Sequence, residues 1–309
     1  AQKNELATLG ILQAKLLKSG NLLVAHGKEF SLRPDRGSMP VLLELDWDGN
    51  VVWRYENEMM HHDFERLPAQ AGLPDGRTAV IVYERISEEL ASRVKGGIPG
   101  SGKSTGMYSD AIIEIDEQGK VVWRWALWER LDPELPENIV PSWSGRNVWT
   151  SLNSIEYLAD NPITKKPAYL IGVHRFSAMM LVERDSGNII WRGGGTKVIE
   201  SPHSAVLTKT GGVLAFDNGE GPPAGIGATF VQRSKIIEIQ PALVNGKEWV
   251  NTQTFIYAPE PPVAAKAAFF TPANGSVQEL QNGNILVSAG ITGRIFEIYI
   301  FVLFWECPR

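Results

Sequence analysis

The chain has 309 residues, of which 43% are hydrophobic and 21% are charged, and its formal net charge is −5. This hydrophobic content supports a packed core and excludes a disordered chain, and the scattered lysines and arginines form no basic stripe that would bind nucleic acid. The single cysteine, Cys307, excludes an internal disulfide and a cysteine-rich zinc site.

The N-terminal part of the sequence contains two consecutive strand–turn–strand phrases. The first is AKLLKSGNLLVAHG at Ala14–Gly27, and the second is LLELDWDGNVVWRYE at Leu42–Glu56. In each phrase an alternating apolar strand leads into a polar turn and then into a second strand, which is typical of a β-hairpin. Two such hairpins make one four-stranded antiparallel sheet.

The same pair of phrases recurs along the chain. Copies of the first phrase lie at Phe64–Glu84, Ile155–His174, Ala205–Gly219 and Gln278–Gly290. Copies of the second phrase lie at Ala111–Trp125, Met179–Gly194, Lys235–Val250 and Arg294–Glu306. The last strands of the repeats end near a tryptophan, namely Trp53, Trp123, Trp191, Trp249 and Trp305.

An isolated four-stranded sheet of this kind cannot bury both faces, whereas packing the units around an axis buries them and leaves only short edges. We therefore predict an all-β fold, a β-propeller of four-stranded antiparallel blades in one domain spanning residues 1–309. A large β-sandwich is the rival fold. Sandwich strands alternate in the same way, but they do not repeat a Gly-x-Val-Val-Trp phrase.

Insertions between the repeats predict a helix and several loops. Residues Glu84–Lys95 have helical apolar spacing. The glycine-rich loop Gly96–Tyr108 contains a match to the P-loop pattern G-x-x-x-x-G-K-[ST], from Gly97 to Ser104. A working P-loop follows a strand and opens a helix, and here a helix precedes the loop and a strand follows it. We therefore interpret it as a glycine loop. Leu131–Trp149 and Pro259–Pro272 are proline-containing connections.

Two of the five histidines share one repeat position, at the start of the first strand. That position is occupied in chain order by Leu12, His62, Asn153, His203 and Gly275. The first strand of a propeller blade lines the central channel, so we expect His62 and His203 at one mouth of it, a concave place where polar groups form a ligand site. His61 is adjacent to His62 in an extended segment, so we expect its side chain to point the other way.

A second alignment places His26 and His174 at the ends of second strands, with Arg175 beside His174. For His26 we favour a structural role. Two histidines in the channel are compatible with two kinds of chemistry. They could bind a metal, with His174 or Asp63 as a third ligand. Alternatively, one neutral histidine acts as a nucleophile, a second as acid or base, and an arginine holds an anion.

The chain resembles the arylsulfotransferase family, whose members are PAPS-independent bacterial enzymes with a propeller body. The resemblance rests on HHDFERLP, NSIEYL, VHRFSAMMLVER and SPHSAV, at His61–Pro68, Asn153–Leu158, Val173–Arg184 and Ser201–Val206. It implies a transiently sulfated histidine that takes a sulfuryl group from an aryl sulfate and passes it to a phenol.

The resemblance also implies roles for individual residues. His203 matches the nucleophile and His62 a second site histidine, an acid/base or oxygen donor, while His174 and Arg175 would hold the anion. Asn153, Ser151 and Asp63 would bind substrate. This chain departs from the family pattern at two places, because Ser151 stands where the family has a histidine, and Val173 where it has an arginine.

We expect a small aromatic substrate, no cofactor, no resident metal and no nucleic acid or membrane partner, and a homodimer stays open. No apolar run reaches the roughly 18–20 residues of a membrane span. Periplasmic or secreted localisation is implied by the resemblance alone, since the N-terminal AQKN is no signal peptide. The alternative functions are a non-catalytic binding scaffold and a metal-dependent enzyme. Family propellers have six blades, and a sixth would come from Leu131–Trp149 or Pro259–Pro272, or be absent.

Overall fold

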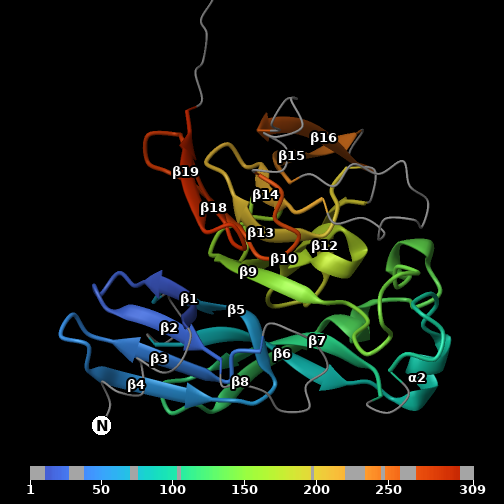
Figure 1. Ribbon diagram of the computed structural model, residues 1–309, viewed down its shortest axis with the longest axis horizontal. Coiled ribbons are helices and arrows are strands. Elements are labelled where there is room, and N and C mark those ends of the chain that lie inside the picture. The colour runs from blue at the N-terminus through green and yellow to red at the C-terminus, as the bar shows by residue number, and fades with distance from the viewer. Residues whose placement is uncertain are drawn as a thin grey trace, which may run out of the picture. The chain divides into compact units, whose positions relative to one another are not determined.

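The computed structural model describes residues 11–27, 38–69, 76–102, 106–195, 198–219, 234–244, 248–257 and 269–299. Within these ranges the chain is nearly all β and forms four four-stranded antiparallel sheets and one three-stranded sheet (Figure 1). The predicted fold class, a β-propeller of antiparallel four-stranded blades, is confirmed. The predicted final strand near Trp305, and Cys307, lie outside the described residues. No helix in the described ranges is long and apolar enough to cross a membrane.

The strands follow chain order in every sheet. The first sheet contains β1 (Ile11–Leu16), β2 (Leu22–His26), β3 (Val41–Leu45) and β4 (Val51–Glu56). The second contains β5 (Met60–Arg66), β6 (Thr78–Arg85), β7 (Tyr108–Ile115) and β8 (Val121–Ala126), and the third contains β9 (Leu152–Leu158), β10 (Ala168–Val173), β11 (Ala178–Glu183) and β12 (Ile189–Gly194). The fourth contains β13 (Pro202–Leu207), β14 (Val213–Asp217), β15 (Lys235–Val244) and β16 (Glu248–Tyr257), and the fifth contains β17 (Ser276–Glu279), β18 (Ile285–Ala289) and β19 (Arg294–Ile298).

The chain divides into two compact units, which are described separately below. The first comprises Ala1–Phe176 and Met180–Ile190, and the second comprises Ser177–Met179 and Trp191–Arg309. Each unit has its own apolar core. Phe64 and Met60 are fully buried in the first, and Phe216 and Phe269 in the second. A single domain over residues 1–309 stays a prediction.

Repeated turn chemistry sets the hairpins of the first two sheets. Asp46 accepts hydrogen bonds from the backbone N–H groups of Asp48 (3.0 Å) and Asn50 (2.8 Å). Asp116 accepts the equivalent bonds from Gln118 and Lys120. The glycine of each turn, Gly49 or Gly119, has a positive φ of 79° or 77°. An aspartate followed by such a glycine therefore ends one strand and starts the next.

Two tryptophans on outer strands join neighbouring sheets within the first unit. Trp53 Nε1 on β4 donates to the backbone oxygen of Glu117, which follows β7, over 2.9 Å. Trp125 Nε1 on β8 donates to the backbone oxygen of Gly187, between β11 and β12, over 2.9 Å. These bonds link each outer strand to the hairpin of the following repeat.

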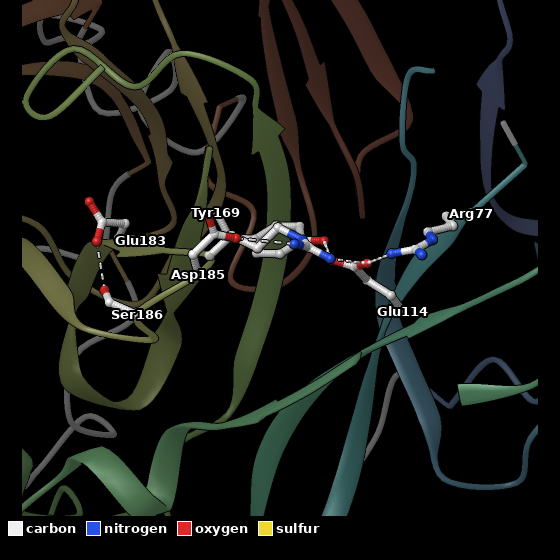
Figure 2. A network of polar contacts seen from close by, with 7 residues as sticks. Arg77, Glu114, Tyr169, Glu183, Asp185 and Ser186 are labelled. Atoms are coloured by element: carbon white, nitrogen blue, oxygen red, sulfur yellow. Dashed lines mark hydrogen bonds and ion pairs between the residues drawn. The ribbon is translucent and has the colours of Figure 1, made fainter. Parts of the chain in front are cut away.

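A buried polar network centred on Glu114 also connects the second and third sheets (Figure 2). Glu114 on β7 is fully buried, and its carboxylate accepts two hydrogen bonds from Arg184, over 2.6 and 2.8 Å. Tyr169 on β10 donates its hydroxyl to the same carboxylate over 2.8 Å, and Arg77 contacts it over 3.4 Å. Burial and the neighbouring Glu114 charge raise the pKa of the Tyr169 hydroxyl well above its ordinary value.

The predicted helix is present but shorter than Glu84–Lys95. Helix α2 covers Glu88–Arg93, because Glu84 and Arg85 continue β6 and the Ser87 side chain caps the helix by accepting from Leu90 N. The glycine loop that follows has the reversed context that we predicted, with α2 before it and β7 after it. The backbone N–H groups of Gly97 and Ile98 donate to Val140 and Ser144, so they do not cradle a phosphate. Lys103 and Ser104 lie outside the described residues.

The connection Leu131–Trp149 contains no blade of its own. Its regular elements are the 3-10 helix η2 (Pro136–Asn138) and single bridges from Val140 to Gly96 and from Val148 to Tyr108. Arg146 in this connection donates to the backbone oxygens of Ala91 and Val94, at the end of α2. Most of Pro259–Pro272, the other candidate for a sixth blade, lies outside the described residues.

Candidate active site

The shared repeat position lies at, or in the fourth repeat directly before, a register irregularity at the start of the first strand of four sheets. The register shifts around Leu12 on β1, between Met60 and Phe64 on β5, around Asn153 on β9, and around Ser204 on β13. His62 and Ser204 have positive φ values of 56° and 54° there. A bulge inserts an unpaired residue and re-aims the side chains around it.

His61 and His62 contact each other, so the prediction that their side chains point in opposite directions is wrong. The two Nδ1 atoms lie 2.7 Å apart, and the rings meet edge to face. Side chains alternate only while a strand keeps regular extended dihedrals. The positive φ of His62 breaks that alternation and turns both rings toward the same side.

Behind His62, His61 is enclosed by the second sheet. It is fully buried and stacks on Tyr83 of β6, with ring centroids 3.6 Å apart. Its Nε2 lies 3.2 Å from Oδ1 of Asp110 on β7, which is also fully buried. Within the described part of the chain, neither atom has a hydrogen-bond partner, so this close contact is the one that pairs them. The first unit therefore contains a chain of side chains in the order Asp110, His61, His62.

The other carboxylate oxygen of Asp110 holds the segment that carries Ser151 and Asn153. It accepts hydrogen bonds from the Thr150 hydroxyl and, over 2.8 Å, from the backbone N–H of Leu152. Ser151 has a φ of 55°, and both Ser151 and Asn153 are buried. In the first unit, Asp110 therefore contacts both the histidine pair and the predicted substrate-binding segment.

His174 and Arg175 lie against the same segment. They begin the 3-10 helix η3 (His174–Phe176), and their backbone N–H groups donate to the oxygens of Ser151 (2.9 Å) and Thr150 (3.3 Å). The Arg175 guanidinium donates to the backbone oxygen of Gly145. Val173, where the resemblance expects an arginine, is fully buried on β10. The anion-holding role of His174 and Arg175 stays a prediction.

Asp63 links three strands. Its carboxylate accepts from Gln13 Nε2 (2.6 Å) and from the backbone N–H of Ile155 (2.9 Å), and it pairs with Lys15 Nζ at 3.0 Å. Burial alone would lower the pKa of Lys15, but the Asp63 and Glu65 carboxylates raise it above its ordinary value. These contacts tie β5 to β1 and β9, whereas substrate binding by Asp63 stays a prediction.

His203 lies on β13 in the second unit, where its ring is oriented by a buried amide. Its Nδ1 is 2.6 Å from Oδ1 of Asn218, which is fully buried. The amide nitrogen of Asn218 donates to the backbone oxygens of Thr271 (2.7 Å) and Asn274 (2.8 Å). Because both amide hydrogens face carbonyl oxygens, the oxygen faces His203 and can only accept. His203 therefore carries its proton on Nδ1, which leaves the lone pair of the neutral ring on Nε2.

Next to Asn218, an acidic pair shares one lysine. Asp217 Oδ2 lies 2.9 Å from Lys235 Nζ, and Asp217 Oδ1 accepts from the backbone N–H of Glu200 over 3.0 Å. Burial, reinforced by Asp217, raises the pKa of Glu200 to about 7 against the opposing charge of Lys235. Burial likewise raises the pKa of Asp217, again against Lys235. The pKa of Glu200, which is three residues before His203 in the sequence, therefore lies near neutral pH.

The sequence pattern did not point to Asp110, Asn218 or the role of His61. The alignment that placed His26 and His174 at the ends of second strands reaches Asp217 and Asn218 in the fourth repeat. It therefore offered a signal for Asn218. Asp110 offered none, because it lies just before the repeated phrase that begins at Ala111. Whether His62 and His203 share a channel mouth stays a prediction, since they belong to different units. Among the described residues, no group of three or more His, Cys, Asp or Glu side chains has an arrangement that could hold a metal ion.

Comparison with known proteins identifies the family to which these repeats correspond. The arylsulfotransferase (ASST) family matches residues 72–299. Similar solved structures include a protein of unknown function from Bacteroides caccae, with 12% identity over 91% of this chain and 71% of that chain, and a TM-score of 0.46. Another is the β-propeller domain of Cps50 (Swd1) from Myceliophteria thermophila, with 12% identity over 93% and 72% of the two chains and a TM-score of 0.44. No curated protein matches the sequence significantly.

Proposed function

The chain belongs to the arylsulfotransferase family, and on this premise we propose that it transfers a sulfuryl group from an aryl sulfate to a phenol through a covalent intermediate on His203. The observation that supports this most strongly is the 2.6 Å contact between His203 Nδ1 and Asn218 Oδ1. It leaves the lone pair of the neutral ring on Nε2, the form in which an imidazole is a nucleophile.

The reaction has two balanced steps. In the first, the Nε2 lone pair forms a bond to sulfur, the bond from sulfur to the aryl oxygen breaks, and the phenolate leaves with the electron pair. In the second, the oxygen of an acceptor phenol attacks sulfur, its proton passes to a base, and the N–S electron pair returns to Nε2. We assign His62 as that acid/base, with His174 and Arg175 opposing the charge on the sulfuryl oxygens.

Asn218 suits the intermediate because a neutral amide accepts a hydrogen bond but does not take the proton. Once Nε2 carries the sulfuryl group, the ring keeps its Nδ1 proton and is positively charged. Hydrogen bonding to Asn218 stabilises that charge. A positively charged ring is a good leaving group, so the sulfuryl group stays transferable to a phenol.

The test is transfer from a nitrophenyl sulfate to a phenol, with wild-type protein and His203→Ala. We expect nitrophenolate release and acceptor sulfation to disappear in the variant, and a mass increase of one SO₃ group on the His203 peptide of donor-treated wild type. Full-rate transfer by His203→Ala would refute the nucleophile. A wild-type chain that binds the aryl sulfate without transferring it would favour the scaffold alternative.

Asn218→Ala tests the orienting amide. Removing a well-placed hydrogen bond to a charge that develops in the transition state costs about 10²–10³ in kcat, and we expect a loss of this order. Asn161→Ala is the matched control. Asn161 is also fully buried, and its amide nitrogen donates to the Thr164 hydroxyl and the Lys166 backbone oxygen, within a turn of the first unit. Equal losses in both variants would show that Asn218 acts only on stability.

A further inference from the structure

Asp110 and His61 are fully buried and lead to His62, and the steps above give neither of the two a role. Resting on the proposed function, we propose that Asp110 and His61 are positioning residues that fix His62 with its proton on Nδ1 and hold its Nε2 lone pair ready to act as the base.

Asp110 is the fully buried end of this chain of side chains. Its Oδ2 accepts from the Thr150 hydroxyl and from the Leu152 backbone N–H, and two such donors stabilise an ionised carboxylate. A carboxylate only accepts hydrogen bonds. Its Oδ1 faces His61 Nε2 at 3.2 Å in a site from which water is excluded, since both side chains are fully buried. A lone pair on Nε2 would set two acceptors against each other, so the His61 proton lies on Nε2.

His61 contacts His62 through their two Nδ1 atoms, which lie 2.7 Å apart. At this distance one nitrogen donates and the other accepts. A neutral His61 with its proton on Nε2 has its lone pair on Nδ1, so His61 accepts and His62 donates from Nδ1. The neutral His62 ring then carries its lone pair on Nε2.

Besides the tautomer of the neutral ring, this arrangement also affects the protonated form of His62. When His62 takes a proton at Nε2, it keeps the bond from Nδ1 to His61, and the positive charge lies at one end of a chain of polar contacts whose other end is the Asp110 carboxylate. Stacking on Tyr83, 3.6 Å between ring centroids, fixes the plane of the His61 ring. The positive φ of His62 turns its ring back onto His61. Such strain persists where the surrounding structure holds it and is typical of functional sites.

Asp110→Asn reverses the chain while it changes little in shape. The amide oxygen of the new asparagine is required by the Thr150 and Leu152 donors, so its NH₂ group faces His61. His61 Nε2 must then accept, Nδ1 must donate to His62, and the His62 proton moves to Nε2. We expect long-range ¹⁵N–¹H correlation NMR, recorded at alkaline pH where imidazoles are neutral, to show His62 protonated on Nδ1 in wild type and on Nε2 in Asp110→Asn.

Ser109→Ala is the matched control. The Ser109 hydroxyl contacts Thr150 Oγ1 over 2.9 Å in the same buried cluster, and the pairs Asp110–His61 and His61–His62 do not involve it. We expect this variant to keep the wild-type tautomer and kcat, whereas Asp110→Asn should lower kcat by about 10²-fold or more, the scale of general acid–base catalysis, with little change in KM.

Wild-type His62 protonated on Nε2, or an unchanged tautomer in Asp110→Asn, would overturn the proposed chain. A reversed tautomer with an unchanged kcat would overturn its part in the reaction. The NMR result needs no sulfate transfer, so a failure of the proposed function leaves this assignment standing or falling on its own.

Discussion

Glu114 offers the sharpest test of how the first unit is held together (Figure 2). Glu114→Gln replaces a fully buried carboxylate that Arg184 contacts twice, over 2.6 and 2.8 Å, and to which the Tyr169 hydroxyl donates over 2.8 Å. The new NH₂ group faces donors instead of acceptors, and the substitution removes the buried partner of Arg184, whose pairing with Asp185 over 3.3 Å is to a side chain that is 71% exposed. Breaking a buried ion pair by removing one partner costs about 3–5 kcal/mol, so we expect a loss of free energy of unfolding of that size.

Glu129→Gln is the matched control for that experiment. Glu129 pairs with Arg124 over 3.0 Å, but their side chains are 36% and 39% exposed, and an exposed pair contributes about 0–1 kcal/mol. Urea unfolding followed by tryptophan fluorescence measures both variants, and equal m-values would show that the same surface unfolds. If Glu114→Gln cost no more than Glu129→Gln, the network would not stabilise the joint between these sheets.

Two further predictions concern the second unit. Because its folded pKa is raised from 4.5 to about 7, Glu200 contributes stability that is fully present below 4.5 and lost as the pH rises through about 7. The urea midpoint should therefore fall more between about pH 5 and about pH 8 for wild type than for Glu200→Gln. Equal falls in the two proteins would contradict this. Gly275→Ala should cost about 1–3 kcal/mol, since its φ is +118° and a Cβ would lie 2.9 Å from the Phe216 ring. Gly283→Ala, with φ +84° and open space around it, should cost clearly less in the same assay.

The sequence by itself determined the repeat and most of the fold. Alternating apolar residues, turns such as Asp46–Gly49 and the closing tryptophans are local signals, and local dihedral preferences decide hairpins. The predicted strand phrases accordingly appear as antiparallel sheets in the described ranges. The repeat alignment also found the shared position at the start of the first strands, but it did not predict the register shift that the structure shows there in four of them.

Only the tertiary structure decided how the histidines are held. The bulge and positive φ at His62 turn it onto His61, which a regular alternation places on the opposite side. Asp110 meets Thr150 from 40 residues away, and Asn218 meets Thr271 from 53 residues away. No periodicity encodes such contacts, because they depend on which strands pack together and on which buried donors and acceptors remain to be paired. The contacts of His62 and His203 therefore come from partners that the chain brings to them only once it has folded.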